Sequence, residues 1–398
     1  MERYFDNIYE KLYKEPETSD LWYKARHYVL DYMDTLDGDG IKINDSKHVH
    51  VVFDELNRNT LAVARQIALI AHYPNFNEKT CQNRTLITFY NSQSESDISI
   101  NNIEEVKFIN RIVDFGNLFD RCLYSFDGER RNEEYQDVNK NNYFPLDIEF
   151  EFKTEVYNEL NNKESDKIIK SSEIEIVFDT FKGNEIDITK GVYVNMVYNT
   201  GVEIDNLPAC DNDNVRRYDT ALRVFCYKLK KDHIKQRWDN TAKPNDSGKY
   251  KDIDVKNQIS SIFCADCFES RLRSILDTSE KSVKEYLAFN FNEVMKTLCS
   301  EDDNYKVLNA LAYCEHNRWN VERLIMGFSP LGSKDRFELE CIFGKERKCK
   351  IRDFKNEKKH IDLCSNYELR RVNPADVKYD YFLMLAMPQI LQSYYKIK

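Results

Sequence analysis

Glycine and proline are scarce in this sequence, with 11 and 8 residues among 398. Their scarcity excludes collagen-like and low-complexity architectures, which are rich in both. Long apolar runs are missing too: the most apolar stretch, Tyr381–Leu391, is far shorter than the roughly 20 residues that cross a bilayer, and it contains Pro388. Because 41% of the residues are hydrophobic and 13% are aromatic, we expect instead a globular protein without a membrane partner, large enough for two or three domains.

A surplus of basic residues is also missing. The net charge of −10 argues against a protein whose main partner is nucleic acid, although it leaves local basic patches open. The 11 cysteines are an odd number and cannot all pair within the chain, and the one Cys-x-x-Cys, Cys264 and Cys267, has no second pair at zinc-finger spacing. We therefore expect two buried thiols on or near a helix, no metal site and a reducing compartment. The opening residues MERYFDNIYEKLYKE are charged throughout, so we expect no signal peptide and a cytoplasmic protein.

What is present is an alternation of strand and helix patterns. The run HVHVVF at 48–53 predicts a buried strand, and 60–74 predicts an amphipathic helix with Thr60 as its N-cap and Pro74 at its end. RTLITFYN at 84–91 predicts a second strand. Strand, helix and strand at this spacing indicate a parallel sheet, so the fold class we expect is an α/β Rossmann-like parallel sheet domain followed by a mainly α-helical domain.

The remaining elements follow from the same patterns. Residues 1–36 predict helix and 37–40 a turn, and beyond a linker at 238–252 the sequence is mostly helical. Further strands are predicted at 145–152, 173–181 and 191–199, and further helices at 103–119 and 212–232. The domain organisation we expect is a helical segment at 1–47, a Rossmann-like domain at 48–240 and a helical domain at 253–398.

The loop that would hold a dinucleotide phosphate lacks the residues for that task. Phosphate-binding loops of this fold use glycines, which let the backbone approach the pyrophosphate at a helix N-terminus. Here the loop Phe53–Thr60 has no glycine, and Asp54 and Glu55 would repel a phosphate. The second strand ends in Asn91 where an acidic residue usually holds the ribose. We therefore expect a degenerate Rossmann-like scaffold with no cofactor.

The stretch CEHNRWNVERLIMGF, 314–328, concentrates charged and aromatic residues on one predicted helix that ends at Gly327. Arg318 falls on the helix's apolar stripe, and Glu315 at i−3 and Glu322 at i+4 can both reach it. A buried arginine needs such partners, so we predict a Glu–Arg–Glu network. The apolar stripe consists of Val307, Leu311, Cys314, Val321 and Ile325. From the pattern alone, the helix could be a structural network, the wall of a ligand pocket or, least well supported, a catalytic site.

This helix resembles the bacterial ryanodine-receptor (RyR) domain, which typically reads E-H-x-R-W, then E, then G-W. Phe328 stands where the final tryptophan is usual. The matching residues are Glu315, His316, Arg318, Trp319, Glu322 and Gly327. The segment at 358–369, KKHIDLCSNYEL, is similar to the family's lysine–histidine segment, and 378–391 is similar to its closing helix. The stretch between Phe328 and Lys358 is longer than the family pattern.

The residues upstream carry a second, thinner resemblance. The stretch at 257–275 is similar to the helix that connects RyR domains to a potassium-uptake-regulator (TrkA-N-like) Rossmann domain, and the first predicted strand and helix are similar to that companion domain. Together the two resemblances imply a degenerate TrkA-N-like domain followed by an RyR-like helical domain.

The resemblance implies a non-enzymatic sensor that recognises a small, nucleotide-derived or anionic ring-containing molecule in bacterial signalling or phage defence. Trp319 would stack a ring, and basic residues would meet an anion. The ligand-binding residues that it implies are Glu315, His316, Arg318, Trp319, Glu322, Lys358, Lys359 and His360. Two alternatives stay open: a scaffold that binds a protein partner or its own copy without a ligand, and an enzyme acting on a nucleotide with Glu315 or His316 as acid–base.

Overall fold

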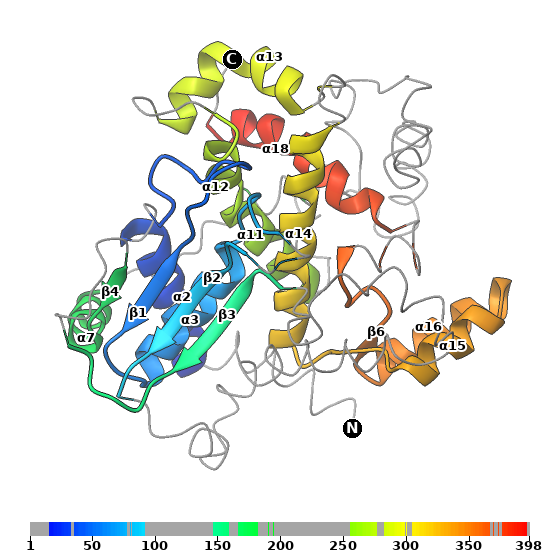
Figure 1. The fold of residues 1–398 in the computed structure, drawn as a ribbon, viewed down its shortest axis with the longest axis horizontal. Helices are drawn as coiled ribbons and strands as arrows, with labels where there is room; N and C mark the ends of the chain where they lie inside the picture. Colours follow the sequence, from blue (N-terminus) through cyan, green and yellow to red (C-terminus); the bar gives the residue numbers. More distant parts are fainter. Residues whose placement is uncertain are drawn as a thin grey trace.

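The computed structural model describes a mixed α/β protein in which a parallel sheet and the helices on it are followed by a mainly helical region (Figure 1). The described residues are 16–32, 36–77, 80, 82–91, 146–158, 166–181, 190, 194, 255–276, 282–298, 300, 305–366, 369, 373 and 376–395. In chain order the elements are α2 (Pro16–Tyr32), β1 (His50–Phe53), α3 (Arg58–Ile70), β2 (Thr85–Phe89), β3 (Ile148–Phe152), β4 (Lys167–Ile169), α7 (Ser171–Thr180), α11 (Val255–Asp266), α12 (Phe268–Arg273), α13 (Val283–Leu298), α14 (Lys306–Ile325), β5 (Ser329–Pro330), α15 (Ser333–Cys341), α16 (Gly344–Asn356), β6 (Lys359–His360) and α18 (Lys378–Tyr394).

The sheet has the strand order β3-β2-β1-β4, and all its strands run parallel. The predicted strand–helix–strand unit is confirmed, because α3 connects β1 to its parallel neighbour β2. The predicted strand at 145–152 is confirmed as β3. In this order the chain moves outward from β1 to β3 and then returns to the other side of β1. The carboxyl ends of β1 and β4 therefore meet at the point where the strand order reverses, which is where open α/β sheets bind their ligands.

The prediction of a strand at 173–181 is wrong, because these residues form helix α7. Ile174, Ile176 and Phe178 alternate as in a strand, but Ile174, Val177 and Phe178 also have helical spacing. The short β4 already fills the position beside β1, so the following residues cover the sheet instead. As a helix, α7 buries Ile174 and Phe178, packs against α2 and α3, and leaves Ile176 64% exposed.

The two faces of the sheet differ in chemistry. Side chains alternate along each strand, and one set, which includes Val51, Ile87 and Phe89, belongs to the large core beneath α2, α3 and α7 (Figure 1). The other set includes polar residues that bond across the strands. His50 contacts Thr88 Oγ1 through Nε2 at 2.9 Å, and the Thr88 hydroxyl donates to Glu151 at 3.0 Å. Parallel sheets are usually apolar on both faces, and this one departs from that rule.

The helical region packs directly onto the sheet region. Helices α11 and α14 contact α3, and Ile259 of α11 and Val321 of α14 belong to the same core cluster as the sheet. Arg26 on α2 donates from Nε and Nη2 to the two carboxylate oxygens of Asp266, at 2.8 and 2.6 Å. Both side chains are almost fully buried. Of the expected domains at 1–47, 48–240 and 253–398, parts of all three therefore share one core in the described residues.

Several sequence predictions can be placed only in part. The helix at 1–36 is described as α2, and the turn at 37–40 is present, whereas residues 1–15 lie outside the described part. The predicted helices at 103–119 and 212–232, the linker at 238–252 and the boundary between 240 and 253 also lie outside it. Of the strand predicted at 191–199 only Val194 is described, and its backbone is helical. None of the described helices is long and apolar enough to cross a membrane.

Candidate functional site

Helix α14 carries most of the predicted site residues, and it ends where the sequence predicts. Gly327 has a φ of +79°, a conformation that glycine adopts without the strain of a side chain. Its N–H donates to the Leu324 carbonyl, and the N–H of Phe328 donates to the Arg323 carbonyl. These two bonds satisfy carbonyls that the end of a helix leaves open and form a Schellman motif. The motif turns the chain toward β5, which brings Phe328 beside β6.

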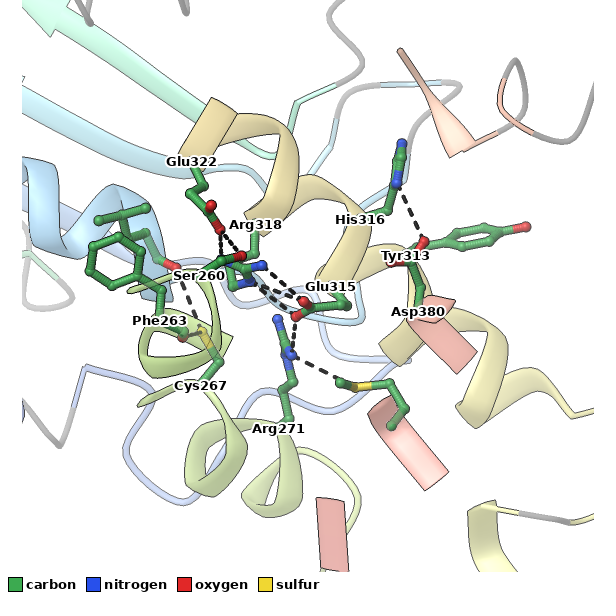
Figure 2. A network of polar contacts seen from close by, with 12 residues as sticks. Ser260, Phe263, Cys267, Arg271, Tyr313, Glu315, His316, Arg318, Glu322 and Asp380 are labelled. Carbon is green, nitrogen blue, oxygen red and sulfur yellow. Dashed lines mark hydrogen bonds and ion pairs between the residues drawn. The ribbon is translucent and has the colours of Figure 1, made fainter. Parts of the chain in front are cut away.

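The predicted Glu–Arg–Glu network is confirmed at the centre of α14 (Figure 2). Arg318 donates from Nη2 to Glu315 at 3.0 Å and from Nη1 to Glu322 at 2.6 Å. The three residues are each exposed by 2% or less, so water does not screen their interaction. Glu322 also accepts a hydrogen bond from the Ser260 hydroxyl on α11 at 2.7 Å, which ties the network to the neighbouring helix.

Arg271 on α12 extends this network and was not predicted. It donates from Nη1 to Glu315 at 2.6 Å, so Glu315 lies between two arginines (Figure 2). Arg271 is 44 positions away in sequence, and no local spacing indicates the contact. With Arg271 the network contains two guanidinium groups and two carboxylates, which balances the buried charge. Balanced, hydrogen-bonded charges are the form in which ion groups persist in a protein interior.

The network holds its groups in their charged forms. Burial would raise the pKa of Glu315, but Arg318 and Arg271 outweigh burial and lower this pKa to about 2. Burial would lower the pKa of Arg318, but Glu315 and Glu322 outweigh it and raise that pKa well above its usual value. A carboxylate with so low a pKa holds no proton to donate at neutral pH, and its oxygens are already occupied by donors. Glu315 is therefore poorly suited to act as a general acid.

His316 lies on the other side of α14 and is also buried. Its Nε2 lies 2.9 Å from the Cys364 carbonyl, and its Nδ1 lies 3.4 Å from Asp380 on α18. Burial would lower the pKa of His316, but the bonds to Asp380 and the Cys364 carbonyl outweigh burial and raise it to about 10. The ring is thus an imidazolium at neutral pH, with both N–H groups donated to acceptors. It fastens α14 to α18 and has no lone pair with which to accept a proton.

Trp319, the predicted stacking residue, lies at the edge of the buried region and is partly exposed. Its ring is stacked near His316, with centroids 6.0 Å apart, and meets the edge of His360 at 4.9 Å. Arg323, one turn along α14, lies over the same ring at 5.0 Å. Phe328 contributes a second partly exposed ring, under Arg323 at 5.8 Å and Lys358 at 4.9 Å. We call Trp319, Arg323, Phe328, Lys358 and His360 the aromatic–cation rim.

His360 contributes a neutral hydrogen-bond donor to this rim. Burial lowers the pKa of His360 well below its usual value, and the charges of Lys355, Arg323 and His316 lower it further. Its Nδ1 accepts the backbone N–H of Asp362 at 3.2 Å, so the proton of the neutral ring lies on Nε2. No hydrogen bond to Nε2 is present among the described residues.

Lys359 belongs to a different surface from its neighbours. Successive residues of a strand point to opposite sides, and Lys359 in β6 contacts Asp335 on α15 at 3.0 Å and Glu357 at 3.4 Å. The predicted ligand-binding residues thus divide into three sets. Glu315, Arg318 and Glu322 form the buried network, and His316 fastens α14 to α18. Trp319, Lys358 and His360 meet at the aromatic–cation rim, whereas Lys359 faces α15.

Cys264 and Cys267 are buried thiols at the junction of α11 and α12, as predicted. The Cys267 thiol donates to the Phe263 carbonyl at 3.3 Å. Burial raises the pKa of Cys267 to about 12, despite the opposing charge of Arg271. Metals and electrophiles react with the thiolate form, which this environment disfavours. Among the described residues, no group of three or more histidine, cysteine, aspartate and glutamate side chains has an arrangement that could hold a metal ion.

At the carboxyl edge of the sheet, the chain's own side chains take the positions that a phosphate would use. Asp54 accepts the backbone N–H of Ser171, the first residue of α7, at 2.7 Å, and Glu55 accepts the Ser171 hydroxyl at 2.9 Å. The predicted N-cap Thr60 is wrong by one turn: Asn57 is the cap and accepts the N–H groups of Asn59 and Thr60. The Thr60 hydroxyl completes the capping box by accepting the Asn57 N–H at 2.8 Å.

Comparison of the chain with protein-family models, with curated proteins and with solved structures finds no match.

Proposed function

We propose that this protein is a cytoplasmic, non-enzymatic sensor that binds a small anionic molecule with an aromatic ring, of the nucleotide-derived class, at the aromatic–cation rim. The observation that carries the proposal is Trp319, a partly exposed indole that lies beside the rings of His316 and His360 and under the guanidinium of Arg323. An indole next to cations offers a stacking face and an attraction for negative charge within one ligand's reach.

The electrostatics of the rim favour an anion. Arg323 and Lys358 lie over its rings, and Lys355 and the His316 imidazolium are close enough to lower the pKa of His360. His360 itself stays neutral and can donate from Nε2 to a ligand oxygen or ring nitrogen. A neutral aromatic ligand would use the Trp319 face but would gain nothing from the surrounding positive charge. An anionic ring compound uses both.

The buried network supports binding rather than acid–base catalysis. Glu315, with a pKa of about 2, carries no proton, and His316, with a pKa of about 10, carries two that are both donated. Efficient acid–base groups have a pKa near the working pH and reach the substrate. These two groups do not meet the first condition. The His316 ring instead lies beside Trp319, whose indole meets His360 of β6 as well, so buried residues hold it in place. A preorganised ring loses little freedom when a ligand stacks on it.

In this proposal the sheet region is a degenerate Rossmann-like (TrkA-N-like) scaffold, and the helical region is an RyR-like recognition domain that serves bacterial signalling or phage defence. The resemblance of residues 314–328 to RyR domains is the basis for the domain assignment. The cap of α3 supports the scaffold role, because the Asn57 side chain already accepts the N–H groups at the helix N-terminus that a phosphate would need.

The proposal is tested by titrating nucleotides and their cyclic and conjugated derivatives into the protein in a calorimeter and recovering each ligand for chromatography. We expect an anionic ring compound to bind and to be recovered intact. Trp319→Ala should weaken it by about 1–3 kcal/mol, the usual effect of losing one aromatic stacking partner of a base. Phe289→Ala is the matched control, since Phe289 is an aromatic residue of α13 with 81% exposure. Helix α13 lies at the opposite end of the molecule from β6 (Figure 1).

The same experiment decides between the proposal and its alternatives. Multiple turnovers of the compound that are lost in Glu315→Gln or His316→Ala, while binding remains, would establish an enzyme instead. If no nucleotide class binds and a protein partner co-purifies, the protein is a scaffold. Equal losses in Trp319→Ala and Phe289→Ala would place the ligand elsewhere than the rim.

A further inference from the structure

Helix α16 carries a concentration of positive charge that the acidic composition of the whole chain conceals. Between Gly344 and Lys359, eight lysine and arginine residues stand against three acidic ones, within a protein whose net charge is −10. Helices α15 and α16 lie at the periphery of the molecule, on the side away from the sheet (Figure 1). Only Phe354 of α16 is buried, where it packs with Leu331, Leu339 and Ile361. The exposed side of the helix is therefore available to a partner.

The cations of α16 form two groups with different surroundings. Lys350 points toward α15 and pairs with Glu338 at 2.7 Å, and the Arg347 guanidinium bonds to the Leu339 carbonyl. The other four recur at i, i+3, i+7 and i+10, which places them within an arc of about 80° on one side of the helix. These four, which we call the basic stripe, are Lys345, Lys348, Arg352 and Lys355. All four are exposed, and none makes a hydrogen bond or ion pair within the described part of the chain.

Helix stability does not explain the basic stripe. Like charges three or four residues apart repel each other and destabilise a helix, and the stripe contains three such neighbouring pairs in succession. The acidic residues of α16, Glu346 and Asp353, lie on a different side of the helix from the stripe. A linear polyanion placed along the stripe would remove the repulsion. The stripe is about 15 Å long, which matches roughly four nucleotides of a stacked strand.

The exposed side chain of Phe343 indicates which class of polyanion fits the stripe. This residue immediately precedes α16, two positions before the first cation of the stripe, and its ring is 79% exposed. A membrane surface fits poorly, because the apolar side of α16 is packed inward at Phe354. The two exposed rings of this region, Phe343 and the less exposed Phe337 on α15, offer too little apolar area to anchor an interfacial helix. An acidic polypeptide would use the charges and leave the ring unused. Single-stranded nucleic acid uses both, since its backbone follows cations and its bases stack on aromatic side chains.

We propose that α16 binds single-stranded nucleic acid, with its phosphates along Lys345, Lys348, Arg352 and Lys355 and a base stacked on Phe343. This proposal does not depend on the ligand proposed at Trp319, although Lys355 at the end of the stripe also lies close enough to the rim to act on His360. Charge distribution, rather than total charge, decides such binding, so the composition of the whole chain does not exclude it.

The test measures the affinity of short fluorescein-labelled oligothymidylate and oligouridylate by fluorescence anisotropy as the salt concentration rises. Four phosphate contacts predict a log–log slope of about −3 for single strands. Lys348→Gln combined with Arg352→Gln should reduce the slope to about half. Phe343→Ala should weaken binding about tenfold and leave the slope unchanged, because stacking releases no counterions. Oligodeoxyuridylate, which has the base of oligouridylate and the sugar of oligothymidylate, is measured as well and shows whether the sugar matters.

The matched control is Lys350→Gln, which removes a lysine from the same helix but from its paired inner side, and it should leave the slope unchanged. Trp319→Ala should also leave oligonucleotide binding unchanged, which separates this site from the rim. The proposal is overturned if the double variant binds as the parent does, or if a duplex or polyglutamate binds as tightly as the single strand. Binding to phosphatidylserine vesicles without binding to oligonucleotides would also overturn it, in favour of a membrane surface.

Discussion

The carboxyl edge of the sheet and the aromatic–cation rim are two places where a nucleotide could bind, and they treat negative charge in opposite ways. At the sheet edge, Asp54 accepts an N–H at the start of α7, and Asn57 accepts two at the start of α3. The donors that would hold a phosphate are thus already used. At the rim, Arg323 lies over the ring of Trp319 and adds positive charge to a partly exposed surface. An anion site depends on which donors the fold leaves available, more than on the fold itself.

The comparison also separates two roles along α14. Arg318 and Arg323 are five residues apart on one helix, yet the first is buried between two carboxylates and the second lies at the rim. Arg318 holds the two carboxylates of the buried network, whereas Arg323 approaches Glu322 at 3.6 Å and lies over the Trp319 ring, where we propose that a ligand binds. Substitution of Arg318 should therefore lower the stability of the fold, whereas substitution of Arg323 should weaken the proposed ligand.

The largest expected effect is on stability, from Arg318→Met. This change removes one cation and leaves Glu322 without its main partner and Glu315 with Arg271 alone. Unpaired buried carboxylates should lower the free energy of unfolding by roughly 3–5 kcal/mol. Urea denaturation measures it, with Arg352→Met as the matched control: Arg352 is exposed and makes no ion pair within the described residues, so we expect a change of less than about 0.5 kcal/mol. If Arg318→Met unfolds at the parent's urea midpoint, the buried ion network does not stabilise the fold, and the distinction between this network and the aromatic–cation rim is wrong.

The second effect concerns pH and belongs to His316. Its pKa is raised from 6.5 to about 10 in the folded protein, so its stabilisation is fully present below pH 6.5 and is lost as the pH rises toward 10. The residue contacts Asp380, the Cys364 carbonyl and the ring of Trp319. We expect His316→Gln to cost about 2–3 kcal/mol at pH 6, the scale of hydrogen bonds to a charged group, and progressively less at higher pH.

Urea midpoints of the parent and His316→Gln across this pH range measure the effect. Asp380→Asn should reproduce the same pH-dependent difference, because it removes the carboxylate that keeps the ring charged. A difference between parent and variant that stays constant up to pH 10 would show that His316 is neutral in the folded protein. The acid–base interpretation of this residue would then regain support.

The spacing of residues along a single segment was enough to predict two features of the structure. The strand–helix–strand unit and the pairing of Arg318 with Glu315 and Glu322 follow from spacing along one segment, and both are confirmed. The contact between Arg271 and Glu315 joins helices far apart in sequence, so no pattern within either helix encodes it. The same holds for His316 and Asp380, which meet only because α14 packs on α18.

The wrong predictions arose where two local patterns compete. Residues 173–181 fit both the strand and the helix period, and the position of β4 in the sheet decided for the helix. At the start of α3, both Asn57 and Thr60 are good capping residues, and the capping box uses them together, with the helix beginning earlier than predicted. That Asp54 repels a phosphate stays a prediction from the sequence, and its bond to the Ser171 N–H could be found only from the fold.

The smallest expected effect tests the sheet edge itself, through Asp54→Asn. The amide can still accept the Ser171 N–H but loses the negative charge beside the start of α7, so we expect a loss of about 1 kcal/mol in unfolding free energy. Asp179→Asn, at the exposed far end of α7, is the control and should change stability by less than about 0.5 kcal/mol.

Because Asp54 fills the anion position, NAD, NADP, ATP and ADP-ribose should not stabilise the parent through this edge. A ligand at a hundredfold excess over its dissociation constant would add about 2.7 kcal/mol, which thermal melting readily detects. A clear stabilisation of the parent that disappears in Arg58→Ala would show that the loop before α3 holds phosphate in another way, and the contrast between edge and rim would fail.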